Sequence, residues 1–208
     1  MDMSEKYIVT VTRQFGSQGR PIAKKLAERL GWDYYDRDIV DMTAKKLNMP
    51  VSEVGDLEEA VQGRFFGMKY PLGMGTSDIQ DKIFEQQAKI IKDLASKNKS
   101  CIIVGRCSDY ILREFPNCLH IYIYAPYEKR YEVCLNDFHM QPNEAKKMML
   151  EVDKARERYH KQYAGYLPAD IRYKGMMVDS SIFGQEGTVE VLEQYIKSWK
   201  AHKNDNKL

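Results

Sequence analysis

The chain has 208 residues, of which 43% are hydrophobic and 30% charged, a balance typical of a globular protein with one buried core. Lysine and arginine total 32 against 30 aspartates and glutamates, and a net charge of +2 excludes a generally basic surface for nucleic acid or membranes. No apolar run is long enough for a signal-peptide core or a membrane span. We therefore expect a cytoplasmic protein of one domain, with neither nucleic acid nor membrane as a partner; its oligomeric state stays open.

The first part of the chain alternates strand and helix patterns. The β-branched stretch Tyr7–Thr12 predicts a strand buried on both faces. Pro21 suits the first position of a helix that ends at Gly31, and a short strand is expected over Asp33–Tyr35. From Ile39 to about Leu57 the pattern is helical, with a break at Met49-Pro50 and with Ser52 suited to cap the new start.

The remaining pattern predicts a glycine-rich loop over Arg64–Thr76, either a gate or a connector, and then further strands and helices. Helices are expected over Asp78–Ser96, Tyr127–Leu135, Pro142–Tyr163 and Val189–Trp199, strands over Ser100–Val104, Leu119–Tyr124 and Met176–Val178, and a fraying tail over Ala201–Leu208. This alternation predicts an α/β three-layer sandwich with about five parallel strands, and ligands at the carboxyl ends of those strands.

Cysteines and histidines are scattered along the chain without a close C-x-x-C pair. We therefore predict free, buried thiols in a reducing compartment and no metal site built from these residue types. The four cysteines are Cys101, Cys107, Cys118 and Cys134.

The turn after the first strand reads FGSQGR, from Phe15 to Arg20. Gly16 and Gly19 permit a tight path that directs backbone N–H groups at the start of a helix toward an anion. An ordinary β-to-α turn is the alternative. The continuation GSQGRPIAKKLAERLG resembles the phosphate-binding loop (P-loop) and first helix of nucleoside monophosphate kinases.

More specifically, the chain is similar to the cytidylate kinase-like family, whose loop has the form R-Q-x-G-S-x-G-R followed by I-A-K-x-L-A. The resemblance runs from Tyr7 to about Trp199 and implies the P-loop kinase fold, with an acceptor-binding insert near residues 37–98 and a lid near residues 136–166. Its other matches are YYDRDI from Tyr34, IIVGRCSDYIL from Ile102, APYEKR from Ala125, DKARERY from Asp153 and VDSS from Val178.

Several residues depart from the pattern of ordinary P-loop nucleoside monophosphate kinases. Gly19 stands at the lysine position, Arg20 at the hydroxyl that would bind magnesium, Arg13 at the first glycine, and Val104 where an aspartate is usual. Because guanidinium groups bind phosphate in a bidentate way, we expect Arg13 and Arg20 to supply the charge for binding and catalysis. The predicted phosphate-binding residues are Gly16, Ser17, Gln18, Gly19 and Arg20.

The resemblance also suggests residues for the acceptor and the lid. Asp36, Arg37 and Arg106 follow predicted strands and are expected to hold the acceptor, with helix caps and structural ion pairs as the alternative. Lys154, Arg156 and Arg158 are lid candidates, although a solvated helix face explains such a charge row equally well. Arg130 matches the family's E-x-R and is equally suited to a structural ion pair.

Two functions remain open at this point. The first is an ATP-dependent kinase, with Mg²⁺ bound to ATP, that phosphorylates a nucleoside monophosphate such as CMP or another phosphorylated metabolite. The second is a weakly active or inactive nucleotide- or anion-binding regulatory module on the same fold, which the missing lysine and hydroxyl favour.

Overall fold

The computed structural model describes residues 6–54, 77–97 and 99–205. Five parallel strands form one sheet in the order β2-β3-β1-β4-β5, which confirms the predicted α/β fold with a five-stranded parallel sheet. β1 is the central strand, and each of its six residues is buried, as its β-branched sequence predicts. The strands are β1 (Ile8–Arg13), β2 (Asp33–Tyr35), β3 (Cys101–Val104), β4 (Cys118–Tyr124) and β5 (Met176–Asp179).

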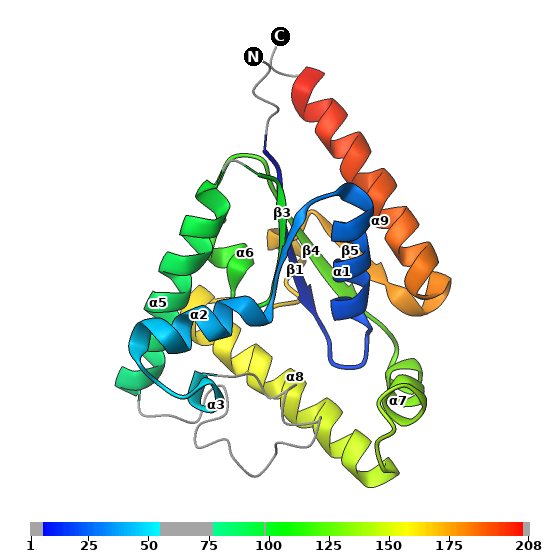
Figure 1. Cartoon of the computed structure of the whole chain (residues 1–208). Helices are drawn as coiled ribbons and strands as arrows, with labels where there is room; N and C mark the ends of the chain where they lie inside the picture. Colours follow the sequence, from blue (N-terminus) through cyan, green and yellow to red (C-terminus); the bar gives the residue numbers. More distant parts are fainter. Residues whose placement is uncertain (1–5, 55–76, 98, 206–208) are drawn as a thin grey trace.

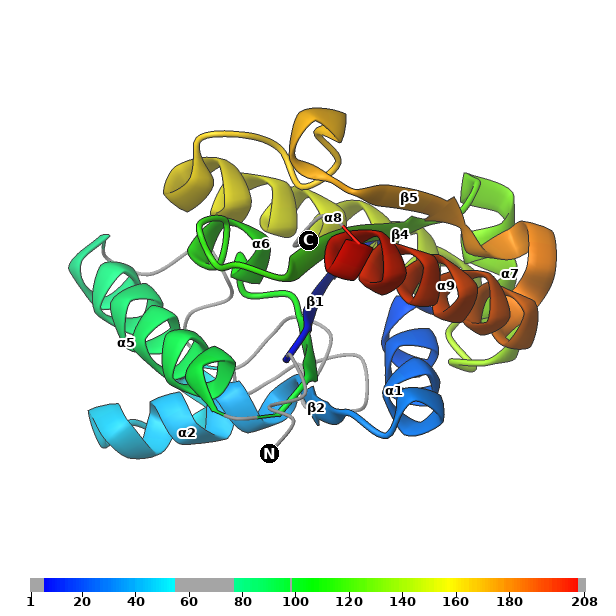
Figure 2. The ribbon, with the colours of Figure 1, turned by 90° about the horizontal axis from the view of Figure 1, so that it is seen from above.

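Helices cover both faces of this sheet (Figures 1 and 2). On one face, α1 (Gly19–Leu30) and α9 (Ser180–Asp205) pack on β1, β3, β4 and β5 in a core that includes Leu26, Ile121 and Leu192. On the other face lie α2 (Arg37–Leu47), α5 (Ser77–Ser96) and the short α6 (Ser108–Ile111). The remaining elements are α3 (Val51–Val54), α7 (Tyr127–Asn136), α8 (Pro142–Ala164) and the 3-10 turn Ile171–Tyr173.

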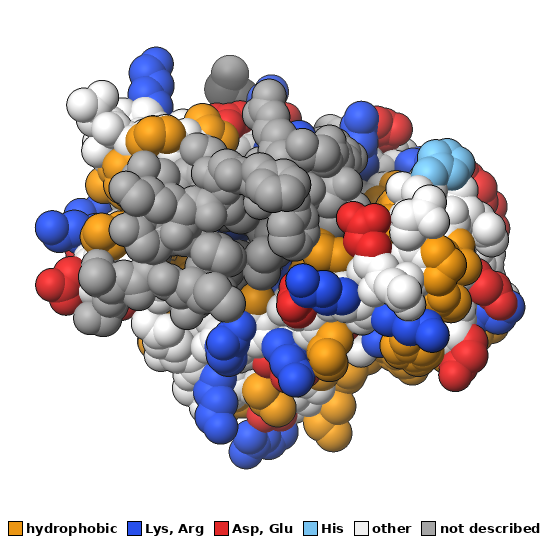
Figure 3. Space-filling model, turned by 90° about the horizontal axis from the view of Figure 1, so that it is seen from below, with side chains coloured by type: hydrophobic (Ala, Val, Ile, Leu, Met, Phe, Trp, Pro, Cys, Tyr) orange, Lys and Arg blue, Asp and Glu red, His pale blue; other side chains and the backbone are white. Residues whose placement is uncertain are grey.

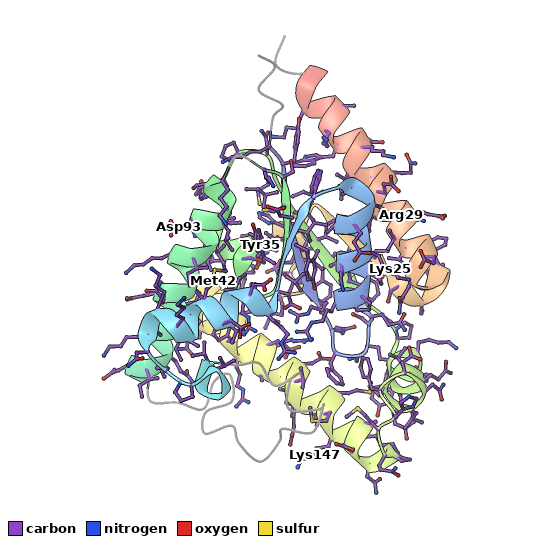
Figure 4. All side chains as sticks on the ribbon, in the orientation of Figure 1. Lys25, Arg29, Tyr35, Met42, Asp93 and Lys147 are labelled. Atoms are coloured by element: carbon purple, nitrogen blue, oxygen red, sulfur yellow. The ribbon has the colours of Figure 1, made fainter. Side chains whose placement is uncertain are left out.

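Ion pairs at the surface join α1 to α9. Lys25 and Arg29 extend from α1 toward α9 in Figure 4. Lys25 pairs with Glu186, and Arg29 lies 3.4 Å from a carboxylate oxygen of Glu193. Such exposed pairs contribute little to stability, so the buried apolar face holds these helices together.

Two helix boundaries differ from the sequence-based prediction. α1 begins at Gly19, so Pro21 is its third residue rather than its first. A proline is tolerated there because the first N–H groups of a helix have no intrahelical acceptor. α9 begins at Ser180, is interrupted by the non-helical Gly184, and continues to Asp205, so residues 201–205 are helical rather than frayed.

The break at Met49-Pro50 is confirmed, because α2 ends at Leu47 and Asn48 adopts a left-handed conformation. Ser52 lies inside α3 rather than before it. The predicted Arg64–Thr76 loop lies outside the described residues. α6 was not predicted because one helical turn carries too short a pattern.

All four cysteines are free thiols, as predicted, and three are buried while Cys118 is half-buried. Among the residues that the structure describes, no helix is long and apolar enough to cross a membrane. The β1–α1 turn lies at the carboxyl ends of the strands, and α8 crosses this end of the sheet (Figure 1).

Candidate phosphate-binding site

The loop between β1 and α1 makes a tight turn that its glycines permit. Gly16 has φ 75°, and a Cβ atom added there would lie only 2.9 Å from the carbonyl oxygen of Arg130. Gln18 has φ 56° and precedes α1 without a side-chain cap on the helix. Glycine is required at position 16 both for its backbone conformation and for this close approach.

Some amides of the loop are already bonded to protein acceptors. The amide of Gln14 donates to the carbonyl of Ile123 over 3.1 Å, and that of Phe15 to Oδ1 of Asp153 over 2.8 Å. The Ser17 hydroxyl lies 2.9 Å from the carbonyl of Gln14 and so supports the turn. Within the described part of the chain, no hydrogen bond engages the amides of Gly16, Gln18 and Gly19. Three N–H groups at the start of α1 thus remain to bind an anion.

Asp153 and two arginines hold the loop against α8. Nη1 of Arg130 lies 2.6 Å from Oδ2 of Asp153 and donates to the carbonyl of Phe15 over 3.0 Å. Nη1 of Arg156 donates to the carbonyl of Arg13 over 3.0 Å. Burial raises the pKa of Asp153, against the effects of the Phe15 amide and Arg130. Of the two interpretations of Arg130, the geometry therefore favours the structural ion pair.

A pocket of about 290 Å³ opens at the mouth of this loop. Its described lining includes five of the residues predicted for phosphate binding or catalysis, and Ser17 is not among the lining residues. The lining consists of Arg13, Gln14, Phe15, Gly16, Gln18, Gly19, Arg20, Pro21, Asp137 and Phe138. We refer to this space as the loop pocket.

A second space of about 220 Å³ lies on the other side of the same turn. It shares Gly16, Gln18 and Asp137 with the loop pocket and also borders the start of α9 at Ser180 and Ser181. Nε2 of Gln18 donates to Oδ2 of Asp137 over 2.6 Å, at the boundary between the two spaces. An elongated ligand could therefore follow the loop from one space into the next.

A smaller cavity of about 40 Å³ brings together three guanidinium groups that are far apart in the sequence. Arg13 comes from the end of β1, Arg106 from the turn after β3, and Arg156 from α8; Arg13 and Arg106 are each only 6% exposed. The other described lining residues are Thr12, Gly105, Cys107, Tyr159, His160 and Pro168, and none is acidic. Since a buried water needs about 10–15 Å³ of such space, the cavity has room for a few waters or one small oxyanion. We call it the arginine cavity.

A buried polar cluster backs the arginine cavity. Nε2 of His160 lies 3.0 Å from both carboxylate oxygens of Asp109, and Nδ1 lies 2.9 Å from the carbonyl of Tyr166. Both partners supply acceptor oxygens, so each ring nitrogen of His160 lies within hydrogen-bonding distance of an acceptor. Lys174, whose side chain is fully buried, also pairs with Asp109.

The charge of Asp109 depends on these partners. Burial by itself raises the pKa of Asp109, but the hydrogen bond from His160 and the charge of Lys174 outweigh burial and hold that pKa well below its ordinary value. Sequence reasoning missed this cluster, because residues 109, 160 and 174 show no common spacing. Burial also raises the pKa of the Cys107 thiol, so this lining residue stays neutral.

The open side of the site carries a different ion pair. Nε of Arg20 lies 2.5 Å from Oδ2 of Asp36, which also accepts from the Tyr34 hydroxyl over 3.3 Å. Two residues predicted for separate roles, phosphate binding and acceptor binding, are thus partners. Burial, followed by the charge of Asp36, raises the pKa of Tyr34.

Three predicted residues lie elsewhere. Arg37 is exposed in the first turn of α2, and Lys154 and Arg158 are exposed on α8; none of them is among the described residues that line the three spaces above. Seen from below, Lys and Arg side chains occur on several parts of this face, with one group near its lower edge (Figure 3). Of the lid candidates, only Arg156 reaches the loop, and the roles of the other two stay predictions.

The described residues are a poor fit for a magnesium ion held by the protein. They contain no group of three or more His, Cys, Asp or Glu side chains placed to hold a metal. Position 20 carries a guanidinium in place of a hydroxyl, and the Ser17 hydroxyl faces backbone carbonyls. The expectation of Mg²⁺ with ATP therefore rests on the nucleotide, since Mg²⁺ can be held largely by phosphates and water.

Comparisons with solved structures identify the fold. An uncharacterized protein from Eubacterium ventriosum superimposes with a TM-score of 0.68 at 23% identity, covering 93% of this chain and 99% of that chain. Shikimate kinase from Acinetobacter baumannii gives 0.51 at 12% identity over 97% and 96% of the two chains. Shikimate kinase from Bacteroides thetaiotaomicron gives 0.56 at 10% identity over 92% and 98%. These similarities confirm the predicted P-loop kinase fold.

Sequence comparison identifies the family. Among curated proteins, no sequence matches this chain. The model of the cytidylate kinase-like family matches residues 8–182, which include the loop, the arginine cavity and α8. The chain therefore belongs to the cytidylate kinase-like family, as its loop and later motifs suggested.

Proposed function

We propose that the protein is a kinase that transfers the γ-phosphoryl group of ATP to the phosphate of a small phosphorylated acceptor, with a nucleoside monophosphate such as CMP as the first candidate. One observation carries this proposal. A loop pocket at the start of α1 adjoins a buried cavity lined by three arginines, and Arg13 belongs to both. The arrangement suits two phosphate-bearing ligands bound side by side.

The donor would occupy the loop pocket. The amides of Gly16, Gln18 and Gly19 and the positive end of the α1 dipole favour a polyphosphate there. The 220 Å³ space across Gln18 offers room for the rest of the nucleotide. Magnesium would enter bound to the phosphates of the nucleotide.

The acceptor phosphate would occupy the arginine cavity. Three guanidinium groups recognise a phosphate by charge and by bidentate hydrogen bonds, and a neutral alcohol group would gain nothing from them.

The reaction balances without a catalytic base. An oxygen of the acceptor phosphate forms a bond to the γ-phosphorus, the bond from that phosphorus to the β–γ bridging oxygen breaks, and a nucleoside diphosphate leaves. A phosphomonoester is largely dianionic at neutral pH because its second pKa is about 6, so the attacking oxygen carries no proton. The protein's part is positioning and electrostatic stabilisation.

A binding module is the second candidate, and two observations favour it. Asp153 already accepts a hydrogen bond from the Phe15 amide, which reduces the number of loop amides available to phosphates. Position 20 carries an arginine in place of a hydroxyl residue, and this arginine pairs with Asp36. A protein of this kind would bind nucleotide or phosphate with little turnover.

A direct assay separates the two candidates. Calorimetry measures the affinity for ATP and for each nucleoside monophosphate, and chromatography measures nucleoside diphosphate formed from each ATP–acceptor pair. If the protein is a kinase, we expect turnover with at least one phosphorylated acceptor and a loss of that turnover in Arg106→Met. Tight ATP binding without product from any phosphorylated acceptor would instead support the module.

A further inference from the structure

The side chain of Arg13 follows a path that two glycines leave open. A Cβ atom added at Gly19 would lie 2.6 Å from Cβ of Arg13 and 3.0 Å from its Cγ, far closer than nonbonded carbon atoms approach. A Cβ atom added at Gly105, which has φ 72°, would meet Nη1 of Arg13. The stem of Arg13 therefore passes Gly19, and its guanidinium reaches Gly105. Neither glycine can become a larger residue while Arg13 keeps this position.

Gly19, against which Arg13 packs, stands at a position that is chemically important in other P-loops. When the loop is aligned with an ordinary P-loop, position 19 is the one at which that loop carries its lysine. Glycine at this position provides no ammonium group. It also leaves room for the side chain of Arg13, which extends from the end of β1. The loop has thus exchanged a cation on the first helical turn for one on the preceding strand.

Arg13 is also the contact between the two candidate ligand sites. Of the described residues, it alone lines both the loop pocket and the arginine cavity. It is 6% exposed, so its charge is weakly screened by solvent. Nη1 of Arg156 donates to its carbonyl and fixes the backbone from which the side chain extends.

We infer that Arg13 takes the place of the missing P-loop lysine and binds the phosphoryl group that lies between donor and acceptor. A planar guanidinium offers hydrogen bonds to oxygens on both sides, which one ammonium provides less directionally. The role in transfer rests on the proposed function, whereas the role in binding a polyphosphate does not.

The first test removes the charge and keeps the packing. Arg13→Met retains an unbranched stem over Gly19, and ATP, ADP and adenosine serve as probes in calorimetry. We expect ATP affinity to fall about 10- to 100-fold, as for a lost charged hydrogen bond, with adenosine affinity unchanged. Arg29→Met is the matched control on α1, because Arg29 pairs with Glu193 outside the pockets. An Arg13→Met protein that binds ATP like wild type overturns the inference.

The second test reverses the exchange. Gly19→Lys alone should lower the melting temperature because its Cβ collides with Arg13. Combining it with Arg13→Gly removes the collision and restores the usual lysine, so we expect recovery of the melting temperature and of ATP affinity to within about fivefold of wild type. A folded double variant that binds ATP no better than Arg13→Gly contradicts the inference. If the double variant does not fold, the Arg13→Met result decides.

These measurements test the kinase proposal and the inference about Arg13 separately. A wild-type protein that binds ATP but phosphorylates no acceptor ends the kinase proposal, and the ATP affinities of the Arg13 variants still test the inference. If turnover is found, Arg13→Met should lower kcat by more than it raises KM for the acceptor, since the group acts on the transferred phosphoryl. An unchanged kcat would remove Arg13 from the transfer step.

Discussion

The buried and the open sides of the candidate site use charge differently. On the buried side, Arg13 and Arg106 are each 6% exposed, and the charged cluster of Asp109 lies behind them. On the open side, the side chain of Arg20 is 30% exposed and paired with Asp36. Charges on the buried side are fixed in position and weakly screened, whereas those on the open side compete with water and salt. We therefore expect substitutions on the buried side to have the larger effects.

The largest effect should come from Asp109. Asp109→Asn leaves Lys174 and His160 buried without the carboxylate that balances them, and breaking such a buried pair costs about 3–5 kcal/mol. Urea denaturation measures this loss of unfolding free energy. Asp93→Asn on the surface of α5 is the control. A change below about 1 kcal/mol in Asp109→Asn would show that the buried side is not organised by this charge.

The same cluster predicts a pH dependence. The pKa of Asp109 is lower in the folded state than in the unfolded chain, so its stabilising effect is complete above the unfolded value near 4 and is lost as the pH falls toward the folded value. The stability difference between wild type and Asp109→Asn should therefore shrink between about pH 5 and pH 2. A difference that stays constant over this range would contradict the assigned charge.

An intermediate effect is expected for Asp153, which joins the two sides by holding the loop. Asp153→Ala removes the acceptor of the Phe15 amide and the partner of Arg130, at a cost of about 1–3 kcal/mol. Glu157→Ala, on the exposed face of the same helix, controls for helix propensity. Because the Phe15 amide is then released, ATP affinity measured by calorimetry indicates whether this hydrogen bond organises the loop or competes with phosphate.

The smallest effects belong to the open side. Arg20→Ala breaks the pair with Asp36 and should change stability by no more than about 1 kcal/mol. If Arg20 also contacts phosphate, ATP affinity falls several-fold, and this loss shrinks as salt is added. Lys24→Ala, one turn further along α1, is the control. Unchanged ATP affinity in Arg20→Ala would remove Arg20 from the phosphate site.

The arrangement of the fold was largely predictable from local patterns. Buried parallel strands need continuous β-branched runs such as that at β1, and the glycine at position 31 ends α1 in a left-handed conformation as expected. Most of the differences, at Pro21, at Ser52 and at both ends of α9, concern helix ends, where several residues satisfy the same pattern.

The candidate site was predictable only in part. The loop and its missing lysine can be read along the chain, because a tight turn before a helix needs glycine at fixed positions. Asp153 and His160 lie on α8 close to its buried apolar residues, but a helical pattern does not show which residue on another element each of them contacts. The pairing of Arg20 with Asp36 was likewise hidden, since each residue is equally suited to a ligand.

The sequence by itself determined the family, the order of strands and helices, and the place of the anion-binding turn, because these depend on residues that are close together in the chain. The tertiary structure alone decided that Arg13, Arg106 and Arg156 share one cavity and that Gly19 and Gly105 leave the path for Arg13. Parallel strands end at a common edge, so residues about 50 to 140 positions apart meet there. The periodicity of a sequence does not show which of those side chains will be in contact.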